Sequence, residues 1–174
     1  MLLLVRHAMP AYGPTVPAHA WTLSAEGWQA ARRLIAQLPR EARLVSSDEP
    51  KAWQTLGGDD AVTRDRRFNE VTRVEPWEGD YRELRRAYVE GADHADWEPR
   101  AEVAERFDAG ITEHLALSGE RPLVVATHGM AMTVWMTARL DLHDPGDFWA
   151  DLRFPDAHLI DLDSGIVERA DLLP

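Results

Sequence analysis

Apolar residues gather in two short uninterrupted runs, residues 2–5 and 123–126, a pattern typical of strands buried on both faces of a parallel sheet. Each run stops abruptly at chemically active side chains. The first ends at Arg6 and His7, and the second leads through a threonine to His128. Ligands of open α/β sheets bind beyond the carboxyl ends of the strands. The two runs therefore predict that both imidazoles lie in one crevice.

Between and after these runs, apolar residues recur at helical spacing. One helix is expected to start after the N-cap Ser24 and to end at Pro39, and shorter helices are expected over residues 51–55 and 80–90. A long helix is indicated by apolar residues at every fourth position, with Gly119 as its C′ residue: Val103, Phe107, Ile111 and Leu115. Another helix is expected over about residues 130–140.

Three shorter signals complete the pattern. Extended segments are expected at residues 44–45 and 61–63, and residues 159–162 and 166–167 predict a terminal hairpin. Pro145 and Gly146 are expected to break the chain.

Strands that alternate with amphipathic helices predict an α/β fold, a three-layer sandwich with a mostly parallel central sheet flanked by helices. The sequence contains no internal repeat, low-complexity tract or linker. We therefore expect one domain over residues 1–174.

Charge and composition exclude several classes of partner and chemistry. The formal net charge of -11 argues against non-specific binding to nucleic acid or to an anionic membrane, both of which need a basic surface. There is no cysteine, which excludes disulfides, thiol catalysis and cysteine-bound zinc. The apolar run before Arg6 is far shorter than a signal-peptide core, so a cytoplasmic location is expected.

Five segments carry motifs that are specific when taken together and in this order. The first two are Leu-Val-Arg-His-Ala (residues 4–8) and Leu-Ser-Ala-Glu-Gly-Trp-Gln-Ala (23–30). The third is Ser-Ser…Lys-Ala-Trp-Gln-Thr (46–55), and the fourth is Phe-Asn-Glu (68–70) with Trp-Glu-Gly (77–79). The fifth is Val-Val-Ala-Thr-His-Gly (124–129). The set resembles the histidine phosphatase (phosphoglycerate mutase-like) superfamily, in its small phosphatase branch. The resemblance implies a phosphoglycerate mutase-like fold and hydrolysis of a phosphomonoester.

The resemblance also implies a catalytic role for each histidine. His7 is the expected nucleophile, because a neutral imidazole attacks well at pH 7 and would form a phosphohistidine. His128 is expected to contact the transferring phosphoryl group as a cation or hydrogen-bond donor. A nearby dianion raises the pKa of such an imidazole and favours its charged form. This scheme requires no metal and no cofactor.

Three groups are candidates for binding the phosphate oxygens. Arg6 offers a two-pronged guanidinium, and the backbone N–H groups of Gly129 and Met130 open a helix whose positive end favours an anion. Lys51, the only lysine of the chain, stands where the family pattern has a second arginine. Lysine keeps the charge and loses the fork. The alternative is that Lys51 points into solvent and another arginine serves.

The general acid is open to three interpretations. The family pattern points to Glu70, but the interval from Glu70 to Trp77 is one residue longer than the pattern, so Glu75 or Glu78 could have moved into place. A working acid must be protonated near neutrality, through burial or a neighbouring phosphate.

Other charged and titratable residues have a simpler interpretation. The mixed charges of residues 64–86 are interpreted mainly as a solvated surface. The remaining histidines lack metal-ligand spacing and are interpreted as structural or surface residues, with His19 as the strongest exception because its loop is expected beside the crevice.

The combined prediction is a metal-independent phosphomonoester hydrolase that works through a phosphohistidine on His7. Its partner is expected to be a phosphorylated small molecule, with a phosphoprotein as the alternative. The alternatives in function are a phosphoglycerate-mutase-type phosphotransferase and a non-catalytic phosphate-binding module. The short chain favours the hydrolase over the mutase, whereas Lys51, Pro10 and Gly13 depart from the family pattern and motivate the binding module. The sequence does not predict an oligomeric state.

Overall fold

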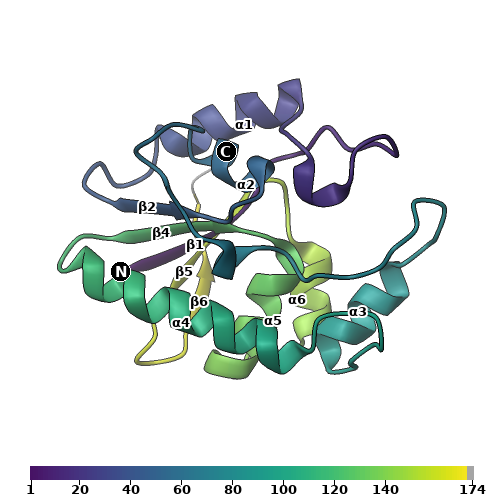
Figure 1. Cartoon of the computed structure of the whole chain (residues 1–174). Coiled ribbons are helices and arrows are strands. Elements are labelled where there is room, and N and C mark those ends of the chain that lie inside the picture. The colour runs from purple at the N-terminus through teal and green to yellow at the C-terminus, as the bar shows by residue number, and fades with distance from the viewer. Residues whose placement is uncertain (172–174) are drawn as a thin grey trace.

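A six-stranded sheet forms the centre of the computed structural model, which describes residues 1–171 (Figure 1). Its strand order is β3-β2-β4-β1-β5-β6. The first four strands in this order are parallel, β5 runs antiparallel to β1, and β6 runs antiparallel to β5. The strands are β1 (Leu2–Arg6), β2 (Arg43–Ser46), β3 (Thr63–Arg64), β4 (Leu123–Thr127), β5 (Asp156–Ile160) and β6 (Val167–Arg169).

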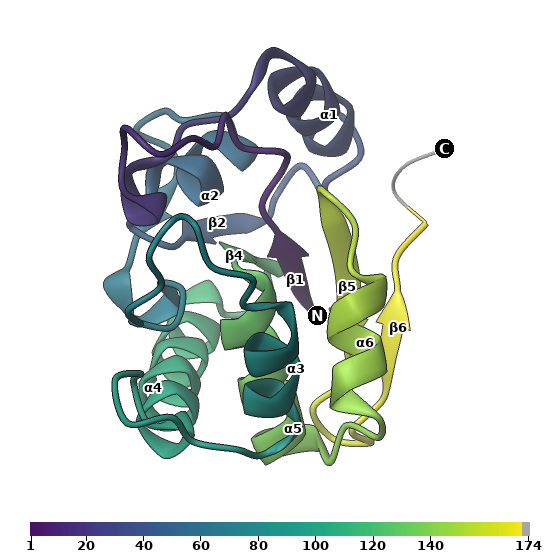
Figure 2. The ribbon, with the colours of Figure 1, turned by 90° about the vertical axis from the view of Figure 1, so that its right-hand side faces the viewer.

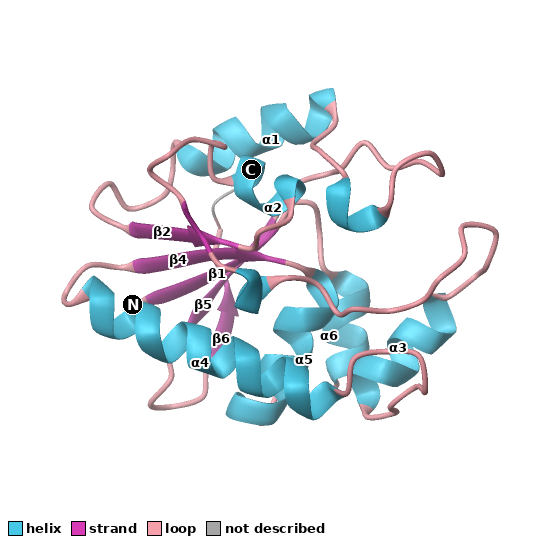
Figure 3. Ribbon diagram, in the orientation of Figure 1, coloured by secondary structure: helices cyan, strands magenta, loops and turns pink. Residues whose placement is uncertain are grey.

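Helices cover both faces of the sheet, so the predicted three-layer α/β sandwich is confirmed (Figure 3). In Figure 1, α1 (Ala25–Ile35) and α2 (Pro50–Thr55) lie above the sheet, and the others lie below it. The lower layer comprises α3 (Arg82–Glu90), α4 (Arg100–Ser118), α5 (Gly129–Leu140) and α6 (Pro145–Asp151). The chain also forms two 3-10 turns, η1 (Ala18–Ala20) and η2 (Arg66–Phe68).

The apolar run of β1 supplies both layers, because successive side chains of a strand point to opposite faces. Leu2 and Leu4 belong to the core beneath α4 and α5, whereas Leu3 and Val5 pack in the core beneath α1 and α2. All four side chains are buried, and each contributes roughly 2 kcal/mol through removal of apolar surface from water. The continuous run thus reflects a strand with no solvent face.

The strand register brings the ends of β1, β2 and β4 to one edge of the sheet. Arg6 is paired with Thr127, and the His7 amide donates to the Thr127 carbonyl oxygen over 3.0 Å. The Ser47 amide donates to the Ala126 carbonyl oxygen over 2.8 Å. The residues that follow the three strands therefore leave the sheet side by side. In Figure 2 the chain after β1 (purple) and the chain before α3 (teal) lie at this edge.

Close approach of α1 to this edge depends on Gly27. A Cβ atom at this position would lie 2.1 Å from the Met9 carbonyl oxygen. The same carbonyl accepts hydrogen bonds from the Ser24 amide and hydroxyl, and the Ser24 Oγ caps the helix by accepting from the Gly27 amide over 3.0 Å. Gly27 and Ser24 thus fix the chain that leaves β1 against α1.

The sequence-based elements are largely confirmed, including the terminal hairpin, which β5 and β6 form. The expected break at Pro145 and Gly146 is wrong, because α6 begins there. Proline is tolerated at the first helical position, where its missing N–H needs no partner. Gly146 lies against α3, since a Cβ atom there would come 2.0 Å from the Glu90 Oε1 atom.

Two further points are limited to the described part of the chain. Within residues 1–171, no helix is long and apolar enough to span a bilayer. The single domain over residues 1–174 stays a prediction, and its last three residues lie outside those that the structure describes.

Candidate active site

A cleft of about 810 Å³ opens beyond the ends of β1, β2 and β4. Five of the six sequence-predicted site residues line it: Arg6, His7, Lys51, Glu70 and Gly129. The sixth, His128, is fully buried, and the centroid of its ring lies 5.1 Å from that of His7. The structure thus brings all six together at the predicted edge of the sheet.

His7 is held in one tautomer by the backbone of the next residue. Its Nδ1 atom donates to the Ala8 carbonyl oxygen over 2.8 Å, which leaves Nε2 as the nitrogen with a free electron pair. Burial lowers the pKa of His7 well below its ordinary value, and the charges of Lys51 and Arg6 lower it further, although the bond to Ala8 opposes them. His7 is therefore neutral at pH 7, the form that a nucleophile requires.

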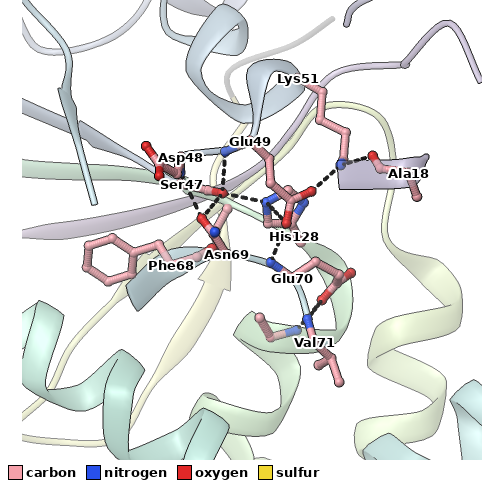
Figure 4. Close-up of polar contacts among 12 residues, drawn as sticks. Ala18, Ser47, Asp48, Glu49, Lys51, Phe68, Asn69, Glu70, Val71 and His128 are labelled. Carbon is pink, nitrogen blue, oxygen red and sulfur yellow. Dashed lines mark hydrogen bonds and ion pairs between the residues drawn. The ribbon is translucent and has the colours of Figure 1, made fainter. Parts of the chain in front are cut away.

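A directed chain of hydrogen bonds orients His128 (Figure 4). The Asn69 Oδ1 atom accepts from the Asp48 amide over 2.8 Å, so it is also the acceptor for the Ser47 hydroxyl at 2.8 Å. The Ser47 Oγ atom accepts in turn from the Glu49 amide at 3.1 Å and from the His128 Nε2–H at 2.8 Å. The proton of neutral His128 is thus on Nε2, and Nδ1 carries the free electron pair.

The second nitrogen of His128 is buried without a partner. Within residues 1–171, Nδ1 makes no hydrogen bond. Burial lowers the pKa of His128 well below its ordinary value, and the nearby Lys51 and His7 lower it further. Both histidines are consequently neutral in the unliganded site, and an arriving anion is needed to favour a proton on Nδ1.

Arg6 is fixed at the side of the cleft by the segment between α6 and β5. Its Nη1 atom donates to the Leu152 carbonyl oxygen over 2.7 Å, and its guanidinium carbon lies 3.6 Å from the centroid of the Phe154 ring. Gly129 leaves room for it, because a Cβ atom there would lie 3.3 Å from Arg6 Nε. Burial lowers the pKa of Arg6 to about 10, although Glu70 and Asp156 raise it, so Arg6 remains a cation at neutral pH.

Lys51 points into the site, and the alternative that it lies in solvent is wrong. The residue is 5% exposed. Its Nζ atom donates to the Ala18 carbonyl oxygen over 2.8 Å and forms an ion pair with the buried Glu49 carboxylate. The cation expected to bind phosphate therefore has an internal counter-ion, which sequence reasoning missed because Glu49 occupies an unspecified position of the motif.

The carboxylate of Glu70 lies at the amino end of α5. Its Oε1 atom accepts from the Val71 amide at 3.0 Å and from the Ala131 amide at 2.9 Å, and its Oε2 atom accepts from the Met130 amide at 3.4 Å. The positive end of this helix, predicted to attract a phosphate, thus holds the side chain of Glu70 in the unliganded protein. Sequence reasoning did not predict this contact.

Arg106 holds the backbone that carries Glu70. It donates to the carbonyl oxygens of Arg67 at 2.6 Å and Asn69 at 3.0 Å, and it pairs with Glu98 at 2.6 Å. A residue of α4 thereby fixes the position of the segment before Glu70.

The other two acid candidates are placed less well. Glu75 lines the cleft, but it forms ion pairs with Arg85 at 2.6 Å and Arg73 at 2.9 Å. Burial raises the pKa of Glu75, but the hydrogen bond from Arg85 and the charges of both arginines outweigh it and hold this pKa below its ordinary value. Glu78 is exposed and is not among the residues that line the cleft. Glu70 is therefore the best placed acid.

The charged segment contributes more to the cleft than its composition indicates. Arg64, Arg73 and Arg85 all line it. Arg64 is exposed, as the interpretation of residues 64–86 as solvated surface requires, whereas Arg73 and Arg85 are partly buried and pair with Glu75, so the interpretation is wrong for these two. His19 lines the cleft too, as its loop position favours. Mixed charge along a sequence does not reveal which side chains turn inward.

Solved structures of similar fold come from several organisms. The chain is 22% identical to the mycobacterial glucosyl-3-phosphoglycerate phosphatase in complex with inorganic phosphate, with 97% of this chain and 94% of that chain covered and a TM-score of 0.68. The chain is 18% identical to YhfR of Bacillus stearothermophilus, with 97% of this chain and 94% of that chain covered and a TM-score of 0.69. It is 15% identical to the Entamoeba histolytica phosphoserine phosphatase in complex with phosphoserine, with 98% of this chain and 94% of that chain covered and a TM-score of 0.67.

No curated protein matches the chain. The structural likenesses show the shared fold, and the family model described as "Histidine phosphatase superfamily (branch 1)" matches residues 2–164. This match confirms the resemblance of the five motifs and the prediction of a phosphatase enzyme. The chain therefore belongs to the histidine phosphatase superfamily.

Proposed function

We propose that the protein is a metal-independent phosphomonoester hydrolase that works through a phosphohistidine on His7. The observation that carries this proposal is the state of His7 in the cleft. It is neutral, its Nδ1 is bound to the Ala8 carbonyl, and a cation and a carboxylic acid candidate line the same cleft. A fixed, unprotonated Nε2 is what an in-line attack on phosphorus needs.

In the first step, the electron pair of His7 Nε2 forms a bond to phosphorus while the bond from phosphorus to the leaving oxygen breaks. Glu70, protonated beside the incoming dianion, gives its proton to that oxygen, and the free alcohol departs. In the second step, water attacks the phosphohistidine and Glu70 takes up a proton from it. Inorganic phosphate leaves, and His7 and Glu70 return to their starting states.

The remaining groups stabilise charge on the phosphoryl oxygens. Arg6 is already a cation and is oriented by Leu152 and Phe154. The bound dianion raises the pKa of His128, so its bare Nδ1 gains a proton and becomes a donor. Lys51 supplies a second positive charge, and the Gly129 amide is the proposed backbone contact at the start of α5. Preorganised donors of this kind are worth about 10²- to 10³-fold in rate each.

Metal independence and substrate class are part of the proposal. Among residues 1–171 no three His, Asp or Glu side chains are grouped to hold a metal ion. The phosphatases of similar fold are named for small phosphorylated molecules, which supports a phosphorylated small molecule as substrate. We further propose a single domain, a cytoplasmic location, and release of phosphate rather than its return to an isomer.

The test is hydrolysis of an aryl phosphate between pH 5 and 8 with a chelator present, for the wild type and for His7→Ala. Turnover that survives the chelator and is lost in His7→Ala supports the proposal. Equal activity in both proteins contradicts a nucleophilic His7. Conversion of a phosphorylated isomer without release of phosphate would favour the mutase, and stoichiometric phosphate binding without turnover would favour the binding module.

A further inference from the structure

A carboxylate that the catalytic scheme does not use lies in the middle of the site. Glu49, at the N-cap position of α2, is 7% exposed. It forms an ion pair with Lys51, its Oε1 atom accepts from the Glu70 amide at 2.9 Å, and the same atom lies 3.6 Å from His128 Nε2 (Figure 4). The buried Glu49 carboxylate thus contacts Lys51, the backbone of Glu70 and His128.

Charge balance makes this arrangement unusual for an anion site. A phosphate dianion is bound best by cations that have no other partner. Lys51 has two partners already, the Glu49 carboxylate and the Ala18 carbonyl oxygen. A phosphate that approaches Lys51 must compete with the Glu49 carboxylate for the ammonium hydrogens. The negative charge of this carboxylate also repels the phosphate.

We propose that Glu49 is a positioning residue that holds Lys51 in a compensated ion pair and thereby limits the affinity of the site for inorganic phosphate. The inference rests on the proposed function, in which inorganic phosphate is the product. A cation engaged by a carboxylate binds this product less tightly than a free one, and weaker binding of the product favours its release. Glu49 therefore biases the site toward hydrolysis with turnover.

Two effects of Glu49 oppose each other, and the distances decide between them. A carboxylate near His128 favours the protonated imidazole and so favours phosphate binding, but it lies 3.6 Å from Nε2, which already donates to Ser47. The contact with Lys51 is a direct hydrogen-bonded ion pair between two buried groups. The effect on Lys51 is therefore the larger one, and removal of the charge of Glu49 increases the affinity for phosphate.

The experiment measures binding of inorganic phosphate to the full chain by calorimetry at pH 7.5, which requires no turnover. Glu49→Gln keeps the shape and removes the charge. It is expected to lower the dissociation constant by about tenfold, because Lys51 then has the phosphate as its only anionic partner. The double variant Glu49→Gln with Lys51→Met is expected to lose this gain. Asp65→Asn, which removes a different ion-paired carboxylate with little exposure, is the matched control and should leave the dissociation constant unchanged.

A purely structural role for Glu49 predicts no gain in the affinity for phosphate. If Glu49 only holds α2 and the Glu70 segment in place, Glu49→Gln weakens or leaves unchanged the binding of phosphate, and either result overturns the inference. If thermal unfolding shows that Glu49→Gln is not folded, Glu49→Asp replaces it. The shorter carboxylate retracts from Lys51, and a dissociation constant that is unchanged or raised relative to the wild type overturns the inference in the same way.

The inference and the proposed function fail differently. A wild type that binds phosphate and hydrolyses a phosphomonoester, together with a Glu49→Gln variant of unchanged affinity, overturns only the role of Glu49. A wild type that neither binds phosphate nor hydrolyses a phosphomonoester overturns both. In active variants, kcat should fall relative to kcat/KM when Glu49 is neutral, because release of the product becomes slower.

Discussion

The ends of β1 and β4 look alike in sequence and differ in the structure. Each is an apolar strand that leads to a histidine, and the two rings lie 5.1 Å apart. His7 donates to the carbonyl of the next residue and lines the cleft, whereas His128 is fully buried and donates to Ser47, the residue that follows β2. The first arrangement leaves Nε2 free as a nucleophile, and the second leaves Nδ1 free to take up a proton. Equivalent positions in a fold thus acquire different roles through one hydrogen bond each.

The largest expected effect separates the two histidines directly. His7→Ala should reduce kcat/KM by about four orders of magnitude or more, because the nucleophile is lost. His128→Asn should cost about 10²- to 10³-fold, as removal of one charge-stabilising donor does. Rapid quenching with a radiolabelled substrate provides the measurement. Acid-labile phosphoprotein should form in His128→Asn and be absent from His7→Ala, and labelling of both would contradict the assignment.

The acid should matter according to the leaving group. Glu70→Gln is expected to lower kcat/KM by about 10²- to 10⁴-fold for an alkyl phosphate, whose alkoxide needs a proton. The loss should be much smaller for a nitrophenyl phosphate, whose phenolate departs unprotonated. Glu78→Gln, at an exposed position outside the cleft, is the control. Equal losses for both substrates would argue that Glu70 has no role in proton transfer.

The buried histidines should also make folding depend on pH. The pKa values of His7 and His128 are lowered in the folded protein, so below about pH 6.5 the unfolded chain binds more protons than the folded one. The free energy of unfolding should therefore fall as the pH falls from 6.5, by about 1.4 kcal/mol per pH unit for each histidine. Urea unfolding at pH 7.5, 6.5 and 5.5 measures this slope. Replacement of both by Asn should flatten it, and a slope that stays the same would show that other groups cause it.

The smallest expected effect tests the hydrogen-bond chain that distinguishes His128. Ser47→Ala removes the acceptor of its Nε2 proton, and kcat/KM should fall by about tenfold, the value of one hydrogen bond. Ser46→Ala is a matched control, because the neighbouring Ser46 hydroxyl is buried and donates to the Ser47 carbonyl. A loss of the same size in the control would mean that the effect is general damage to the strand end.

Much of this site could be predicted because its chemistry follows strand ends. Apolar runs that stop at a histidine indicate His7 and His128, and the sheet register brings them together. The contact between Ser47 and His128 spans 81 positions and leaves no local pattern. The same is true of Arg106, whose helix spacing does not show that it holds the backbone before Glu70.

Local rules failed where a distant contact decides the outcome. Pro145 predicted a break by its chemistry, but the same chemistry suits a first helical turn, and the contact of Gly146 with α3 fixes the choice. The side chain of Lys51 could not be oriented from sequence because its partner Ala18, in η1, lies 33 positions away, and the nearby Glu49 forms no pattern that indicates an ion pair.

The strand order also bears on how the protein is made. During synthesis β1 emerges before the other strands of this sheet, yet its two neighbours are β4 and β5, which begin only at Leu123 and Asp156. The apolar residues 2–5 therefore lack their native partners until β4 and β5 have been synthesised. Exposed apolar segments of this kind are targets for chaperones and for aggregation. One of the two central strands of the finished sheet is thus exposed to aggregation while the chain is synthesised.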